Sequence, residues 1–235
     1  MVIATGKPVF AQENIPPRIH SYLDFTLAFG DQEGTAAGSY VRNWRLGKTR
    51  KLELGLGLRL TSYTGTKREF YTAPARLARS STVPFVGVFS GHEYQNVDTL
   101  TVQSPFTNSL NLSANFGYRI GKKWNAGVNI DLIGFTVGRT NSAILVSNGI
   151  TLAEPNAKSS SFNLLLTGDL DYGSLNSEFF VEYNIAPRWY IKAVYQFFFT
   201  EYNTQAVYQT APDGTEVHRF RNKANLFGAG VSYDL

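Results

Sequence analysis

Three histidines, His20, His92 and His218, are the side chains best suited to proton transfer near neutral pH. His92 lies in the stretch SGHEYQN, where Ser90 and Glu93 stand close to it. Serine, histidine and a carboxylate are the residue types of nucleophilic hydrolysis, in which the histidine activates the hydroxyl group. Such a trio can be assembled from almost any polar loop, so we interpret this one as an ordinary loop and predict no catalytic residue.

The acidic stretch GDLDYGSLNSE suggests a calcium site. Its oxygen-bearing side chains include Asp169, Asp171, Asn176 and Glu178. The EF-hand spacing fails because Gly173 stands at the third acidic position. A turn of Asp and Gly that leads into a strand explains the stretch better. No P-loop, dinucleotide fingerprint or zinc spacing occurs, and the chain has no cysteine, so we predict no metal and no cofactor.

The composition favours strands over helices. Aromatic residues make up 14% of the chain, which contains 21 glycines, 13 tyrosines and 17 phenylalanines. Charged residues make up only 17%, against about 25% in typical soluble domains. No apolar run approaches the ~20 residues of a membrane-spanning helix, which excludes spanning by helices but not by alternating strands. The net charge of +4 is too small to indicate nucleic-acid binding.

The stretch KLELGLGLRL, residues 51–60, has a leucine at every second position. A period of two places these leucines on one face of a β-strand, with Glu53 and Arg59 on the other. In a soluble protein the leucines would face a core. In an outer-membrane barrel they would face lipid, and the polar face would fill the interior.

Alternation of this kind recurs along the chain and predicts eight strands, at 20–30, 38–47, 51–64, 108–121, 124–137, 173–186, 188–201 and 222–235. Three joints are short, with the sequences GKTR, GKK and APR. The other joints are longer, at about 31–37, 65–107, 138–172 and 202–221. Short turns at one end and long loops at the other are typical of outer-membrane barrels. Two residues break the alternation: Phe180 falls on the polar face of its strand and Arg42 on the apolar face.

All three tryptophans, Trp44, Trp124 and Trp189, stand beside the three short turns. Indole side chains prefer the boundary between lipid and water, so this placement predicts a membrane-interface girdle. Several strands reach about 14 residues, whereas a bilayer crossing needs about 9–11 and strands of globular proteins average about 5–6. We therefore predict an all-β fold over 20–235: an eight-stranded antiparallel up-and-down transmembrane β-barrel with short periplasmic turns and long extracellular loops.

The polar face of these strands predicts a lumen that is filled by a mixed-charge network. Its members are Asp24, Glu53, Arg59, Arg119, Asp131, Glu178, Glu182 and Lys192. Eight strands enclose room mostly for side chains, so we expect ion pairs that pack the interior. An alternative is a proton or ion path along Glu53, Asp131 and Glu182.

Over roughly 20–235 the chain resembles the eight-stranded bacterial outer-membrane barrels of the OmpA-, OmpX- and OmpW-like group. Its ending GAGVSYDL resembles the C-terminal insertion signal of that class, with Gly230, Tyr233 and Leu235 at the expected spacing, although Leu235 replaces the more usual phenylalanine. The resemblance implies an outer-membrane monomer whose partners are membrane lipid and the barrel-assembly machinery. Lipopolysaccharide is a further expected partner, through basic loop residues: Lys67, Arg68, Arg76, Arg79, Arg139, Arg219, Arg221 and Lys223.

The leading functional hypothesis is a non-enzymatic barrel with a structural or surface-interaction role. One alternative is a narrow channel or transporter for small molecules, hydrophobic ones included, with a lateral opening as in OmpW-like barrels. The other is a lipid-modifying enzyme, but lipid A deacylases of this architecture carry a serine two positions from the histidine, and here Tyr22, Tyr94 and Phe220 follow the histidines at that distance. Residues 1–19 are expected to be an N-terminal arm or the remnant of a signal peptide, because VFAQ resembles a cleavage site but no apolar region precedes it.

Overall fold

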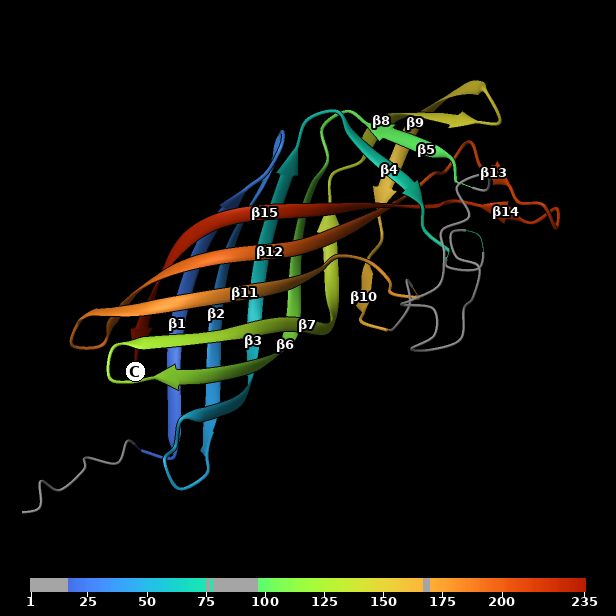
Figure 1. Ribbon diagram of the computed structural model, residues 1–235. Helices are drawn as coiled ribbons and strands as arrows, with labels where there is room; N and C mark the ends of the chain where they lie inside the picture. The colour runs from blue at the N-terminus through green and yellow to red at the C-terminus, as the bar shows by residue number, and fades with distance from the viewer. Residues whose placement is uncertain (1–16, 75–76, 78–96, 167–169) are drawn as a thin grey trace, which may run out of the picture.

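A computed structural model of the chain describes residues 17–74, 77, 97–166 and 170–235. Most of the N-terminal arm expected over 1–19 falls outside this part, as do Ser90, His92, Glu93 and Asp169. Eight long strands form the main wall (Figure 1): β1 (Ile19–Phe29), β2 (Glu33–Leu46), β3 (Leu52–Gly65), β6 (Phe106–Ile120), β7 (Trp124–Gly138), β11 (Leu175–Ala186), β12 (Trp189–Asn203) and β15 (Arg219–Asp234).

These eight strands form a closed barrel. Each pairs antiparallel with the next in the order just given. The last strand, β15, then pairs with β1, from Tyr22↔Asp234 to Phe29↔Phe227, so these eight strands close into a ring. The predicted eight-stranded antiparallel up-and-down barrel is confirmed.

The two faces of the wall differ as the alternation predicts. The five leucines of β3 lie on the outside, each between 41% and 53% exposed. On the same strand, Glu53 and Arg59 point into the lumen and are 1% exposed. The barrel therefore has an apolar exterior and a polar interior, the reverse of a soluble protein.

The long joint predicted at 31–37 is wrong. Only residues 30–32 connect β1 to β2, which begins at Glu33 and continues without interruption to Leu46. Within the first part of β2 the residues that face outward include Gly34 and Ala36. Small residues on the outer face conceal the period of two, which is why the sequence shows no strand there.

The three remaining long joints contain strands of their own, as the unusual length of the joint at 65–107 allows. Four of these are β4 (Arg68–Thr72), β5 (Thr99–Val102), β8 (Asn141–Ser147) and β9 (Ile150–Ser159). They pair in the order β15–β4–β5–β8–β9–β12. Because β12 and β15 also pair with each other, these six strands close a second ring, which we call the outer ring.

The outer ring lies beyond the end of the barrel that is opposite the short turns (Figure 1). Its interior contains an apolar core. Eight residues, drawn from all six strands, are at most 3% exposed: Phe70, Leu100, Val102, Ala143, Leu145, Ala157, Tyr202 and Phe220. The ring therefore has a hydrophobic core of its own, stacked above a polar lumen.

Local turn chemistry supports the β8–β9 hairpin. Asn148 and Gly149 both have positive φ, of 50° and 77°, as a two-residue type I′ turn requires. The remaining strands are short: β10 (Phe162–Leu164) pairs with β7, and β13 (Gln209–Thr210) with β14 (Glu216–Val217). Within the described ranges, no helix has both the length and the apolar character needed to cross a membrane.

Candidate functional site

The centre of the lumen is organised around Lys192, on β12. Its ammonium group bonds to the carboxylate of Asp24 on β1 and lies 3.2 Å from Oε1 of Glu178 and 3.9 Å from Oε1 of Glu182, both on β11. Lys192 is 3% exposed. A buried ammonium group needs such partners, because transfer out of water without them is strongly unfavourable.

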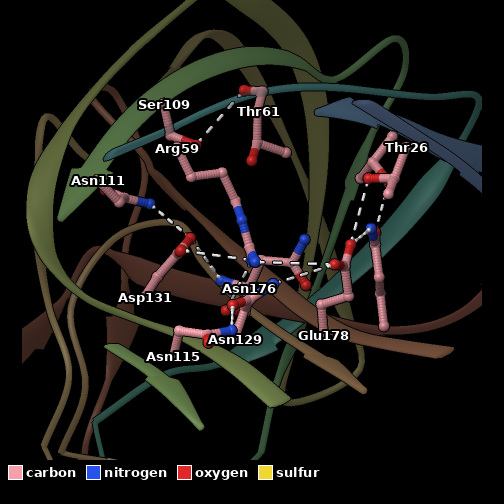
Figure 2. Close-up of polar contacts among 12 residues, drawn as sticks. Thr26, Arg59, Thr61, Ser109, Asn111, Asn115, Asn129, Asp131, Asn176 and Glu178 are labelled. Carbon is pink, nitrogen blue, oxygen red and sulfur yellow. Dashed lines mark hydrogen bonds and ion pairs between the residues drawn. The ribbon is translucent and has the colours of Figure 1, made fainter. Parts of the chain in front are cut away.

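A second cation, Arg59 on β3, faces this cluster from the opposite wall (Figure 2). Its Nη1 lies 3.4 Å from Oδ1 of Asp131, and its Nη2 lies 3.9 Å from Oε1 of Glu178. Glu178 thus lies between the two cations and links them. The central network joins strands from all around the barrel, so it braces the wall from inside.

Neutral side chains complete the network, and the sequence reasoning did not include them. Asn111 donates to Oδ2 of Asp131 at 2.8 Å, and the backbone N–H of Asn176 donates to the same oxygen at 3.0 Å (Figure 2). Gln196 donates to Oε2 of Glu178 at 2.9 Å. The alternation of the strands could have identified these residues. Each stands an even number of positions from a charged lumen residue of its own strand and therefore points inward as well.

Phe180 belongs to the lumen and is not a break in the pattern. It is 3% exposed, and the ammonium of Lys192 lies 4.6 Å from its ring centroid. A cation over an aromatic face is favourable, more so when water is excluded. A Cβ added to Gly127 on β7 would come within 2.7 Å of the Phe180 ring, so the glycine makes room for it.

The predicted network continues as a second cluster at the short-turn end. Glu53 accepts hydrogen bonds from Arg45 at 2.7 Å and Asn43 at 3.0 Å, and it lies 3.6 Å from Nδ1 of His20. Nε2 of His20 lies 2.7 Å from Oδ1 of Asp234.

The eight predicted lumen residues therefore fall into two groups. Arg119 is half-buried and lines the same small pocket at the barrel mouth as Glu53 and Glu182, while the other seven are buried. His20, Arg45 and Asp234 are the ionisable members that the sequence reasoning missed. No three His, Cys, Asp or Glu side chains in the described part of the chain are grouped to hold a metal.

Above the ion pairs the lumen contains an aromatic layer. Tyr63 and Phe198 stack across it with ring centroids 5.0 Å apart, and both are at most 1% exposed. The Tyr63 hydroxyl donates to Glu33 at 2.7 Å, and Arg68 lies 3.0 Å from the other oxygen of Glu33. This layer separates the polar network from the outer ring.

Two arginines at the start of β15 hold the segment before β11 against the wall. Arg219 lies 2.7 Å from Oε2 of Glu201, and the guanidinium lies 3.8 Å from the centroid of Tyr172. Arg221 is 3% exposed and lies 3.5 Å from the same carboxylate oxygen. Both arginines also donate to the backbone carbonyl of Asp171. They clamp the segment before β11 onto β12 and β15.

A single carboxylate fixes the loop that follows β12. Glu154, on β9, accepts hydrogen bonds through Oε2 from the backbone N–H groups of Gln205 and Ala206, each at 2.8 Å, and Val207 at 3.2 Å. Its Oε1 accepts another from Asn156 at 2.8 Å. Burial disfavours the charged carboxylate, but these bonds outweigh that effect and hold the pKa of Glu154 below its ordinary value.

We expect the loop at 205–207 to loosen as the pH falls through the lowered pKa of Glu154. A carboxylate with a depressed pKa stabilises the folded state above its ordinary pKa, and this contribution disappears once the group is protonated. Hydrogen bonds to a charged acceptor contribute about 1.5–3 kcal/mol, so amide protection should fall by roughly tenfold or more.

Hydrogen exchange, corrected for its intrinsic pH dependence, measures this effect. At pH 7, Glu154→Gln should show the low protection at 205–207 that the native chain shows in acid. Glu69→Gln, at an exposed position on β4, is the control and should behave as the native chain. Equal protection in both variants would contradict the role given to Glu154.

All three tryptophans lie on the outer face of the barrel, at the end that carries the short turns. Trp44, Trp124 and Trp189 are between 43% and 50% exposed. Trp124 contacts Tyr183 at a centroid distance of 4.7 Å, and Trp189 contacts Tyr233 at 4.9 Å. These contacts place aromatic side chains beside one another around the short-turn end.

No model of a protein family matches the chain, and no curated protein matches it. Among solved structures, Neisserial surface protein A aligns over 92% of this chain and 96% of its own, with 12% identity and a TM-score of 0.34. Ail, the attachment invasion locus protein of Yersinia pestis, aligns over the same shares with 10% identity and a TM-score of 0.34. Ail in complex with the heparin analogue sucrose octasulfate aligns with 12% identity and a TM-score of 0.33. Similarities this low carry no functional argument.

Proposed function

We propose that the chain is a non-enzymatic β-barrel of the bacterial outer membrane with a surface-interaction role. The exterior of the barrel supports this location. Its apolar side chains are exposed on all sides of the barrel. Examples between 43% and 51% exposed are Leu56 and Phe116 on one side, and Phe179 and Val231 on the other. Apolar side chains exposed around a whole barrel are unfavourable in water and favourable in lipid.

The orientation follows from the two ends of the barrel. The tryptophan girdle of Trp44, Trp124 and Trp189 is proposed to lie at the periplasmic boundary, beside the short turns. Gly230, Tyr233 and Leu235 are at the same end, where they are proposed to serve as the signal for the barrel-assembly machinery. The outer ring then faces the outside of the cell.

The observation that carries the surface role is the outer ring itself. A ring of six paired strands with a packed apolar core holds its shape beyond the membrane, whereas loops of the same length would not. In contrast, buried ion pairs fill the lumen and the stacked pair Tyr63–Phe198 lies above them. This arrangement favours a scaffold over the alternative of a narrow channel.

Labelling of intact cells tests the proposed location and orientation. The native chain has no cysteine, so a single cysteine reports one position. Thr151→Cys places a thiol beside the β8–β9 turn of the outer ring, and Lys122→Cys places one in the short turn between β6 and β7; both positions are exposed. A maleimide that cannot cross the outer membrane should label only Thr151→Cys, and both should react after lysis. Labelling of Lys122→Cys alone in intact cells would contradict the orientation.

A further inference from the structure

A groove of about 650 Å³ runs along the outside of the barrel, near the end that carries the outer ring. It crosses β1, β2 and β3 and ends at Phe106, the first residue of β6. Its volume lies within the range of roughly 300–1,000 Å³ that small-ligand sites occupy. The groove therefore has the size of a binding site, although it opens sideways, away from the lumen.

The groove exists because the outer face of β2 lacks large side chains at this height. Gly34 and Ala36 form its floor, while Leu27 and Phe29 on β1 rise beside them. The Phe29 ring lies 3.0 Å from the position that a Cβ on Gly34 would occupy. Phe106 forms the opposite wall of the groove. It lies level with Phe29, because Phe29 pairs with Gly34, Gly34 with Thr64, and Thr64 with Phe106.

A polar pair lies on this otherwise apolar face. Ser62, which lines the groove, donates a hydrogen bond at 2.5 Å to Oδ1 of Asn108. Both residues have the outward register of the leucines on β3. Among the described residues, none accepts a hydrogen bond from the amide nitrogen of Asn108. Donors exposed to hydrocarbon are unfavourable unless a partner satisfies them, so this pair points to a polar group in the occupant.

We infer that the groove binds one acyl chain of an outer-leaflet lipid, and that Ser62 and Asn108 bind a hydroxyl group carried by that chain. This inference rests on the proposed location in the outer membrane. The groove is continuous with the exposed leucines of β3, so its surroundings are hydrocarbon and its occupant is a lipid. A hydroxyl group both donates and accepts, which matches an open N–H donor next to a serine oxygen.

The depth of the pair distinguishes a hydroxyl on the chain from the ester of the headgroup. Phe29, Gly34, Thr64 and Phe106 form the outermost row, and Ser62 lies two residues closer to the middle of the barrel. Two residues of a tilted strand span about 5 Å along the membrane normal. A polar group at that depth lies closer to the middle of the membrane than the aromatic row. It therefore meets the bound lipid a short way down its acyl chain.

The test uses the full-length chain, purified in detergent micelles and mixed with two phosphatidylethanolamines in equal amounts. One carries myristoyl chains and the other carries 3-hydroxymyristoyl chains, and native mass spectrometry counts the lipids that remain bound. The native chain should retain one lipid, with a preference of about 2- to 10-fold for the hydroxylated form, the effect of one added hydrogen bond.

Three variants locate the site. Ala36→Leu fills the groove and should lower retention by roughly tenfold or more. Ala114→Leu adds the same side chain to the outer face of β6, away from the groove, and should retain lipid as the native chain does. Asn108→Leu should retain a lipid but lose the preference for the hydroxylated form.

Equal retention by Ala36→Leu and Ala114→Leu would overturn the inference, as would a native chain without preference. The mobility of each sample in SDS before and after boiling is measured in parallel. A heat-shifted barrel that retains no lipid overturns only the groove. A chain that stays in solution without detergent and shows no shift overturns the membrane location as well.

Discussion

Replacing Lys192 with methionine is expected to destabilise the barrel by about 3–5 kcal/mol, because a buried ion pair is broken and its partners are left without a cation. Three carboxylates, of Asp24, Glu178 and Glu182, lie within 4 Å of the ammonium group. Methionine has a similar length and no charge, so the loss reports the charge rather than the packing. Lys51→Met, at an exposed position before β3, should leave stability unchanged.

Urea unfolding in lipid vesicles, followed by gel mobility, measures this loss. A second substitution tests the same cause. Asp24→Asn removes one of the carboxylates that lose their cation in Lys192→Met, so the double variant should recover part of the lost stability. Equal urea midpoints for Lys192→Met and Lys51→Met would show that the ion pairs do not brace the wall. The lumen would then need another explanation for its shape.

Replacing Phe70 with alanine should open the outer ring and leave the barrel below it closed. Phe70 is fully buried and contacts Tyr202 edge-on at a centroid distance of 5.2 Å. Removal of a buried phenylalanine side chain costs about 3–5 kcal/mol. The ring is small, so a loss of this size is expected to unfold it locally.

Limited proteolysis distinguishes the two levels of structure. In Phe70→Ala, cleavage should become fast within β4, β5, β8 and β9, while the barrel keeps its mobility shift on heating. Tyr71→Ala is the matched control, since Tyr71 is the next residue on β4 and is 45% exposed on the outer face. Loss of the barrel together with the ring would mean that the two rings fold as one unit.

The sequence predicts the barrel wall well because lipid enforces a strict period of two. The alternating leucines from Leu52 to Leu60 reveal a strand and its outer face. The tryptophans beside the three short turns mark strand ends at one end of the barrel and so show the direction of the strands. Wherever both faces carry residues of similar size the pattern disappears. The stretch from Gly34 to Gly38 shows this, and the first joint was misplaced for that reason.

The outer ring and the pairing inside the lumen could not be predicted in this way. The strands β4 and β5 are only five and four residues long and stand far apart in the chain. The period of two shows that Arg59 and Asp131 face inward, but only the pairing register of the strands shows that their side chains come into contact. The role of Phe180 depends on Lys192, which lies on the neighbouring strand.

The central claim is a closed barrel in the outer membrane, and its most direct test is electrophoretic mobility in SDS before and after boiling. The protein is taken from separated outer-membrane and soluble fractions. A closed barrel resists the detergent until it is heated, so the chain should occur in the membrane fraction and shift its mobility on boiling. Recovery in the soluble fraction without any shift would contradict the account, and the leucines of β3 would then have to face a protein core.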